Sequence, residues 1–162
     1  MSDLLLKAPM IYEPIRKNRF IFKFPSDLGI QSWVVSASNL PSINQNPVEI
    51  PFLNTSTWVL GRYTWDDITI TLKSFIGPST AQAVMEWVRL QSESATGRQG
   101  YAAGYKRDVV ISMLDPTGVA IQKWVLVNAF PTTVNFGSLG YDDDAISDIE
   151  ISLKIDYALL TY

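Results

Sequence analysis

The sequence predicts a mainly β fold, an antiparallel β-sandwich or barrel with one flanking α-helix. Residues 149–157 alternate strictly between apolar and polar side chains, and residues 68–73 repeat that alternation. A period of two is typical of a strand with one buried face and one face in water. Only residues 79–88 show convincing helical periodicity instead. At 162 residues, one domain over residues 1–162 is expected.

The first part of the chain is expected to hold an arm and two strands. Residues 1–18 contain two prolines and no clean periodicity, which predicts an N-terminal arm ordered only by its contacts. Residues 19–24 place three phenylalanines on one side of a strand. A turn over residues 25–29 follows, and residues 30–38 are expected to form a second strand with apolar side chains on both faces.

Residues 39–61 are a long segment with three prolines, which exclude it from a central position in a sheet. Many of its side chains are nevertheless too apolar for a bare solvent loop. We therefore expect an extended arm or loose hairpin that lies on another surface. A neighbouring subunit is favoured as that surface over the chain's own core.

One helix is expected in the middle of the chain. Pro78 and Ser79 open it, and Gln82 stands three residues after Ser79, as in a capping box. A stripe of apolar side chains suited to core packing follows: Ala81, Val84, Met85, Trp87 and Val88. Gly97 and Gly100 are expected to end the helix.

The clearest local signal is a hairpin. Residues 106–114 and 119–129 are expected to be its strands. Residues 115–118 between them read Asp-Pro-Thr-Gly, the pattern of a type I turn. Pro131 is expected to break the end of the second strand, and a Gly- and Asp-rich turn then leads to the alternating strand over residues 149–157.

Composition limits the function classes. The net charge is −3, whereas a nucleic-acid binder needs a basic stripe to neutralise phosphates. The chain has no Cys and no His, which excludes disulfides and the Ser-His and Cys-His nucleophile pairs. Charged residues are 18% of the chain, against about 25% in an average domain, which fits an obligate oligomer or a β fold with Thr and Ser on wet faces equally well. No signal peptide or transmembrane run is found, so a cytosolic product is expected.

The carboxylates give no active site. Asp66 and Asp67 are neighbours in an expected strand, so their side chains point to opposite faces and do not converge as an acid and base. Residues 142–144 are three aspartates in a turn, but their spacing does not match an EF-hand loop, and a solvated acidic turn is expected. The sequence therefore predicts that the protein is not an enzyme and has no catalytic residue, metal or cofactor.

Five short motifs occur in a fixed order along the sequence, and their order is more informative than any one of them. They are RYTWDD at residues 62–67, the alternating strand 68–72, the helix end MEWV at 85–88, the FPT step at 130–132, and the Asp-rich turn with a strand ending IDY at 155–157. As an ordered set they resemble the tail tube proteins of contractile bacteriophages, over residues 19–157.

This resemblance implies a structural virion protein of the tail, made in the host cytoplasm. Members of the family form hexameric rings that stack into the hollow inner tube of the tail, the conduit for genome DNA ejection. The implied partners are further copies of the chain, the tail sheath protein and a baseplate or tube initiator. A tape-measure protein and genome DNA would pass through the lumen without specific binding, and no membrane span is implied.

The resemblance also suggests where these contacts lie. The polar faces of the two alternating strands are expected to line the channel: Thr69, Thr71, Lys73, Glu150, Ser152, Lys154 and Asp156. The two arms are expected to make subunit and ring contacts: Ile11, Tyr12, Val48, Ile50, Phe52, Trp58 and Leu60. The helix is expected to meet the sheath through Glu86, Arg89 and Glu93. A channel for DNA should be on balance acidic, and Lys73 and Lys154 depart from that expectation.

Three alternatives stay open at this point. A tube protein of a related contractile injection or secretion system would share the fold and carry effectors rather than a genome. A carboxylate-dependent enzyme would be a monomer with a deep acidic cleft. A baseplate or tube-initiator subunit usually carries extra domains, for which 162 residues leave no room.

Overall fold

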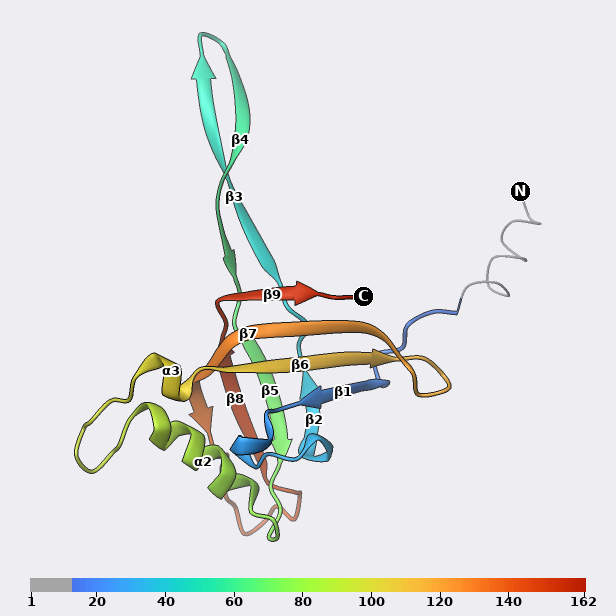
Figure 1. Cartoon of the computed structure of the whole chain (residues 1–162), viewed down its shortest axis with the longest axis vertical. Helices are drawn as coiled ribbons and strands as arrows, with labels where there is room; N and C mark the ends of the chain where they lie inside the picture. The colour runs from blue at the N-terminus through green and yellow to red at the C-terminus, as the bar shows by residue number, and fades with distance from the viewer. Residues whose placement is uncertain (1–12) are drawn as a thin grey trace.

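The computed structural model describes residues 13–162. Seven of its strands form the body, in two sheets that share β7, and the other two form a separate hairpin (Figure 1). β7 (Ala120–Asn135) pairs through its first part with β6 (Arg107–Leu114) and β9 (Tyr157–Leu160). Its second part pairs with β8 (Asp148–Lys154). One strand therefore belongs to both layers of the fold.

The remaining strands of the body extend each sheet. The first sheet continues from β6 to β1 (Phe20–Lys23), and the second continues from β8 to β5 (Ile68–Lys73) and β2 (Val35–Ser38). In Figure 1, β1, β6, β7 and β9 run across the view, whereas β5 and β8 run along the long axis. Every pairing is antiparallel, which confirms the predicted mainly β class with one main flanking helix.

A bulge at Asn128 marks the passage of β7 from one sheet to the other. The register with β6 shifts there, because two residues of β7 lie opposite Asp108 alone. Asn128 has a φ of 55°, a left-handed conformation that Asn tolerates better than most residues. Its N–H donates a 3.1 Å hydrogen bond to Oδ1 of Asp108. Such a bulge bends the strand and increases its twist.

Pro131 does not end β7, contrary to the expectation from the sequence. The strand continues to Asn135, with a second irregularity in its pairing to β8 between Pro131 and Thr133. A proline has no N–H for the ladder, and a bulge is a position where that loss is tolerated. The Pro131 carbonyl accepts a 2.9 Å hydrogen bond from Nε2 of Gln91, which ties the helix to this strand.

The core lies between the two sheets and the helix α2. β5 and β8 supply six side chains that are at most 1% exposed: Ile68, Ile70, Leu72, Ile149, Ile151 and Leu153. The helix adds Val84 and Trp87, and Trp87 donates a 2.9 Å hydrogen bond from Nε1 to the carbonyl of Tyr105. The predicted alternation of these two strands is therefore confirmed as burial of one face.

Helix α2 (Thr80–Gln91) begins where the capping signal predicts, since Oγ of Ser79 accepts a hydrogen bond from the N–H of Gln82. It ends at Gln91, before the predicted glycines. Ser92 is extended and closes the last turn onto Val88, and the loop that follows uses Gly97 in a left-handed turn. A short helix, α3 (Ala102–Tyr105), then leads into β6.

The predicted strand over residues 30–38 is shorter than expected. Only β2 is a strand, and the short 3₁₀ segment η2 (Ser32–Val34) precedes it. Another short 3₁₀ segment, η1 (Ser26–Leu28), forms the predicted turn after β1. The turn of η2 buries Val34 in the core and leaves Trp33 exposed. The adjacent apolar side chains therefore reflect this turn and not a strand that is buried on both faces.

The run over residues 149–157 is two strands rather than one. β8 ends at Lys154, and β9 begins at Tyr157 in the other sheet. The N–H of Asp156 donates to the carbonyl of Val127 at 3.1 Å, which turns the chain toward β7. Tyr157 is consequently exposed and does not extend the buried row of β8.

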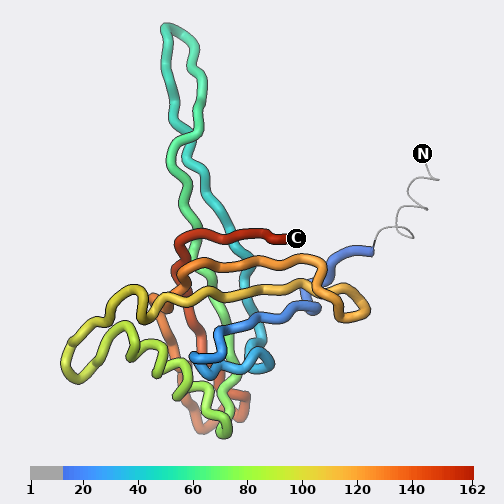
Figure 2. The backbone as a smooth tube through the Cα atoms, viewed as in Figure 1, coloured from blue at the N-terminus to red at the C-terminus, as the bar shows by residue number. Residues whose placement is uncertain are grey.

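The predicted arm over residues 39–61 is part of a long, regular hairpin. β3 (Ile43–Phe52) and β4 (Thr55–Trp65) pair with each other and form a separate two-stranded sheet. Figure 2 shows this hairpin projecting away from the body along the long axis. Every residue of β3 is exposed, so the hairpin does not fold back over the chain's own core.

Candidate channel face and assembly surfaces

The second sheet carries a continuous polar face on the side away from the core. The register of β5 and β8 sets Thr69 opposite Ser152, Thr71 opposite Glu150 and Lys73 opposite Asp148. The polar face is defined by nine side chains: Thr69, Thr71, Lys73, Thr133, Asn135, Asp148, Glu150, Ser152 and Lys154. Six of the seven residues expected to line a channel are therefore brought together on one surface.

Both lysines of the polar face are paired with carboxylates. Nζ of Lys73 lies 2.8 Å from Oδ1 of Asp148, and Nζ of Lys154 lies 3.3 Å from Oδ1 of Asp67. Among residues 13–162, Glu150 has no such ion pair, so the face carries one uncompensated negative charge once Asp67 is counted with its partner Lys154. The two lysines thus do not make the face basic.

Asp66 and Asp67 form the link between β4 and β5 rather than lying within a strand as expected. The side chain of Asp66 accepts a 2.8 Å hydrogen bond from Nδ2 of Asn44 at the base of the hairpin. The two carboxylates are therefore bound to different elements, Asp66 to β3 and Asp67 to Lys154 of β8.

Asp156, the seventh expected channel residue, lies at the corner between β8 and β9. It accepts a 2.8 Å hydrogen bond from Nδ2 of Asn128, and Nζ of Lys106 lies 3.3 Å away. The hydrogen bond from Asn128, followed by the nearby Lys106, lowers the pKa of Asp156 below its usual value. Asp156 therefore holds the corner against β7 and against Lys106, the residue before β6, and is not part of the polar face.

The hairpin exposes apolar side chains on two opposite faces. The pairing places Val48, Ile50 and Phe52 on one face, with Val59 beside Val48. Trp58 and Leu60 lie on the other face, opposite Glu49 and Pro47. All five hairpin residues expected at interfaces are exposed, but the register divides them between two surfaces: Val48, Ile50, Phe52, Trp58 and Leu60. The other two expected interface residues, Ile11 and Tyr12, lie outside the described residues.

Two of the three residues expected to meet a sheath lie on α2. Glu86 and Arg89 are exposed and form an ion pair one turn apart. Glu93 lies beyond the end of the helix, where its carboxylate accepts a 2.7 Å hydrogen bond from Oγ1 of Thr96. It therefore belongs to the loop after α2 rather than to the helix surface.

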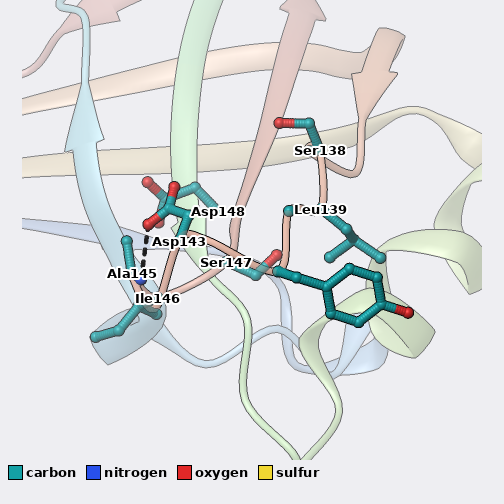
Figure 3. A pocket seen from close by; sticks show the side chains of 10 residues that line it. Ser138, Leu139, Asp143, Ala145, Ile146, Ser147 and Asp148 are labelled. Carbon is teal, nitrogen blue, oxygen red and sulfur yellow. Dashed lines mark hydrogen bonds between the residues drawn. The ribbon is translucent and has the colours of Figure 1, made fainter.

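A surface that the sequence did not suggest is the loop between β7 and β8. It surrounds a hollow of about 680 Å³ lined by residues 137–141, 143 and 145–148, which we call the loop hollow (Figure 3). Leu139 is 96% exposed, and Tyr141 and Ile146 are exposed beside it. The sequence does contain apolar residues in this Gly- and Asp-rich turn, but they follow no strand or helix periodicity that would indicate a surface.

The acidic part of this loop shows no metal geometry. Over residues 13–162, no group of three or more His, Cys, Asp or Glu side chains is arranged to hold a metal ion. Oδ1 of Asp143 instead accepts a 3.0 Å hydrogen bond from the N–H of Ala145 (Figure 3). In the same part of the chain, none of the helices has the length and apolar character needed to span a bilayer.

The arrangement matches solved structures of contractile injection systems. A chain in the cap that terminates the tube of the anti-feeding prophage aligns with a TM-score of 0.74 at 21% identity, over 93% of this chain and 92% of that one. A chain in the extended sheath–tube complex of the PVC extracellular contractile injection system aligns with a TM-score of 0.66 at 21% identity, over 99% and 97%. The fold is therefore shared with chains of these contractile injection assemblies.

The sequence itself identifies the family. The model of the T4-like virus tail tube protein gp19 matches residues 19–158, so the chain belongs to that family of contractile-tail tube proteins. The tail tube protein gp19 of Enterobacteria phage T4 is 25% identical over 126 residues, which are 75% of this chain and 76% of the phage T4 protein. The family resemblance expected from the sequence is thus confirmed.

Proposed function

We propose that six copies of this chain close into a ring, that the rings stack into the inner tube of a contractile phage tail, and that genome DNA passes through the lumen. The observation that carries this proposal is the second sheet, which has a polar face and two free edges. The outer edge of β2 and that of the last residues of β7 pair with no strand within residues 13–162.

Free edges favour closure of the sheet between copies. An unpaired edge offers a row of backbone N–H and C=O groups to another strand, which soluble proteins normally avoid. Pairing β2 of one copy with the end of β7 of the next satisfies both edges at once. Repeating this contact around an axis gives a closed ring in which the second sheet has no remaining edge.

The layers of the fold support an inward position for the polar face in the proposed ring. The first sheet and α2 lie on the apolar side of the second sheet, so that side has to occupy the larger circumference of a ring. The polar face then lines the bore. Six copies of a four-stranded sheet make 24 strands, and strands about 4.8 Å apart with a tilt of about 40° give a backbone diameter of roughly 50 Å. That width admits a DNA duplex after side chains are allowed for.

The charge of the polar face suits a conduit for DNA. With both lysines paired, each copy contributes the free carboxylate of Glu150 to the bore. A weakly acidic wall avoids long-lived contacts with phosphates and lets a duplex slide. We assign the tape-measure protein to the same lumen before ejection, and the outward surface with Glu86, Arg89 and Glu93 to the sheath.

A second candidate is the tube of an extracellular contractile injection system, which carries effectors instead of a genome. The fold likeness to the PVC sheath–tube complex favours it, while the phage T4 relative favours a phage tail. Chains in cap, terminator and baseplate structures also match over at least 92% of their own length. Chain length therefore does not separate a tube subunit from a baseplate subunit, contrary to the expectation from the sequence, nor from a cap or terminator subunit.

The test is electron microscopy of the purified protein in negative stain, with its mass measured by light scattering. Hollow tubes or hexameric rings are the expected result, with or without a baseplate nucleus. Rings that never stack would indicate a cap or terminator subunit. A compact monomer that does not polymerise on a baseplate nucleus would contradict the proposed tube function. Purified particles with DNA-filled heads would separate a phage tail from an injection system.

A further inference from the structure

A recess opens between the two sheets on the side of the body where β1 and β2 lie. Residues of β1, of β6 and of the end of β2 line a hollow of about 310 Å³, which we call the edge recess. Its apolar lining consists of four side chains: Phe20, Leu40, Ile111 and Met113. The volume is within the about 300–1,000 Å³ typical of sites that bind compact groups. Leu40 is 46% exposed, so a group that fills the recess would remove apolar surface from water.

An exposed tyrosine lies on the opposite flank of the body. Tyr101 is 91% exposed and immediately precedes α3, at the end of the loop that follows α2. In Figure 1 this loop and α3 form the left flank, whereas β1 and β2 lie toward the right. The N–H of Gly100 donates a 3.0 Å hydrogen bond to the carbonyl of Gln91, and the Gln91 side chain donates to the carbonyl of Pro131. The backbone that carries Tyr101 is therefore tied to β7 at Pro131.

The strand directions bring the recess and the tyrosine together in the proposed ring. Three successive antiparallel pairings, β7 with β8, β8 with β5 and β5 with β2, make β2 run opposite to β7. Rotation about the ring axis keeps the direction of every strand along that axis, so β2 of one copy pairs antiparallel with β7 of the next. The end of β2 at Ser38 then lies beside the neighbour's Pro131, and its start at Val35 lies beside the neighbour's Asn135. The edge recess, which adjoins Ser38, consequently lies close to the neighbour's Tyr101.

We propose that Tyr101 of one copy inserts into the edge recess of the neighbouring copy in the same ring. This inference rests on the proposed closure of rings and identifies a side-chain anchor for it. The two features lie on the same side of the second sheet. α2 packs on the apolar side through Val84 and Trp87, and the recess is lined by the core residues Ile111 and Met113. Tyrosine is also among the residue types enriched at the energetic centre of interfaces.

The chemistry of the recess suits a tyrosine. Lys17, Ser38 and Asn39 also line it and offer partners for a hydroxyl group, which a buried tyrosine usually requires. Neighbouring copies diverge toward the outside of the proposed ring, where the first sheet and α2 lie, and a projecting side chain spans part of that space. An acyl chain would fill the apolar part of the recess, but it would leave Tyr101 exposed on the opposite flank. A second copy buries both surfaces in one contact.

The experiment uses engineered cysteines, which the natural chain lacks entirely. Tyr101→Cys is combined in turn with Lys17→Cys, Asn39→Cys and Leu40→Cys, and assembled protein is oxidised with a copper catalyst. A disulfide requires Cα atoms within about 7 Å, so three receiving positions sample the lining of the recess. The matched control is Tyr101→Cys with Ile76→Cys, because Ile76 is fully exposed and follows β5 at the other end of the second sheet.

The expected result is a ladder of covalent multimers that ends at six copies for at least one recess pair, because a contact between neighbours closes with the ring. The control pair should give no ladder. Ala102→Cys replaces Tyr101→Cys if the loss of the tyrosine blocks assembly. A ladder that continues beyond six copies would show that the contact joins separate rings, and it would overturn the proposal.

Truncation of the tyrosine gives an independent readout. Tyr101→Ala should raise the protein concentration needed for ring formation about tenfold or more. Circular dichroism should show an unchanged fold, since the side chain is exposed in the single chain. Ser94→Ala, in the same exposed loop, is the matched control and should assemble like the natural chain.

The outcomes separate this inference from the tube function. Tyr101→Ala tubes that form at the natural concentration, together with no ladder from any recess pair, would overturn the inference while the tube function stands. Release of a fatty acid from the purified natural chain by organic extraction, in place of a ladder, would assign the edge recess to a lipid. If the natural chain forms neither rings nor tubes on a baseplate nucleus, the proposed function and this inference both fail.

Discussion

Asn128 and Asp156 connect the two sheets at the point where β7 passes from one to the other. Nδ2 of Asn128 donates a 2.8 Å hydrogen bond to Oδ2 of Asp156. Asn128 is the residue at the bulge of β7, and Asp156 is the corner between β8 and β9. One side-chain contact therefore fixes two changes of direction in the chain.

This contact predicts a pH-dependent contribution to stability. The pKa of Asp156 is lowered in the folded protein, first by the hydrogen bond from Asn128 and then by Lys106. A lowered pKa means that the carboxylate stabilises the fold above its unfolded value of about 3.9, and that the contribution is lost as the pH falls through the folded value. We expect Asp156→Asn to lose at most about 1 kcal/mol near pH 7, because the side chain is 41% exposed.

Urea unfolding between pH 2.5 and 7 measures this effect, and the difference between Asp156→Asn and the natural chain should shrink below about pH 4. Asp144→Asn, in the exposed β7–β8 loop, is the matched control for the change of an aspartate to asparagine. A difference that stays constant down to pH 3 would show that Asp156 acts through shape rather than charge.

The polar face predicts that one charge reversal makes the bore bind DNA. Glu150→Lys replaces the free carboxylate with a cation in every copy of a ring. We expect tubes to form with monomer stability changed by no more than about 0.5 kcal/mol, since the residue is exposed. The variant tubes should retain a short DNA duplex at 50 mM salt and release it at 200 mM salt.

Co-sedimentation of the duplex with tubes measures that retention. Glu150→Gln removes the charge without reversing it and should retain little DNA, while Glu86→Lys places the same cation on α2, away from the polar face. The outcome that contradicts the prediction is retention of DNA by Glu86→Lys tubes and not by Glu150→Lys tubes. In that case α2 faces the bore and the polar face lies on the outside of the ring.

The strands with strict alternation could be predicted from sequence because burial repeats every second residue along a strand. Ile68, Ile70 and Leu72 all lie in the core, as does the matching row of β8. The ends of those strands could not be predicted in the same way. β7 continues past Pro131 because the proline lies at an irregularity in its pairing with β8, and the final run breaks at Asp156 because the chain there changes its pairing from one sheet to the other. Both depend on the partner strands, which are a property of the whole fold.

The assembly surfaces were predictable only in part. Exposed apolar residues in a proline-containing segment indicated an arm, but their division between two faces depends on the register of β3 with β4, which the turn at residues 53–54 sets. The loop hollow was missed because Leu139 and Tyr141 stand in an irregular turn, where no period distinguishes a contact surface from a loop.

The bulge of the hairpin requires a residue without a side chain at Gly61. The register places Gly61 and Arg62 opposite Asn46 alone, and a Cβ on Gly61 would lie 2.7 Å from the carbonyl oxygen of Asn46 and 2.8 Å from Cγ2 of Val48. Gly61→Ala therefore has to displace the hairpin backbone. Because the hairpin packs against the core only at its base, through Trp65, and Gly61 lies beyond that base, we expect body stability to change by less than about 0.5 kcal/mol while tube growth weakens.

Thermal unfolding and the protein concentration required for tube growth separate the two effects. Gly104→Ala is the matched control, since a Cβ there meets no atom within 4 Å. Tubes of Gly61→Ala that grow at the same concentration as those of the natural chain would show that the twist of the hairpin is not needed for stacking.

The exposed side chain of Trp58 is expected to contribute strongly to assembly through the hairpin face that also carries Leu60. It is 59% exposed in the single chain and lies beside Leu60 on the face opposite to Phe52. Buried aromatic side chains dominate interface energies, and truncating one commonly costs about 2 kcal/mol or more. We expect Trp58→Ala to leave the fold intact and to raise the concentration needed for tube growth roughly 30-fold.

Circular dichroism checks the fold of Trp58→Ala, and light scattering at rising protein concentration measures its assembly. Ser56→Ala, on the same face and nearer the turn, is the matched control and should assemble like the natural chain. Insoluble or unfolded Trp58→Ala protein would place Trp58 in a core contact and make its assignment to the interface wrong. A folded variant that assembles normally would restrict the stacking contact to the face that carries Val48, Ile50 and Phe52, because only that face would then be covered in the tube.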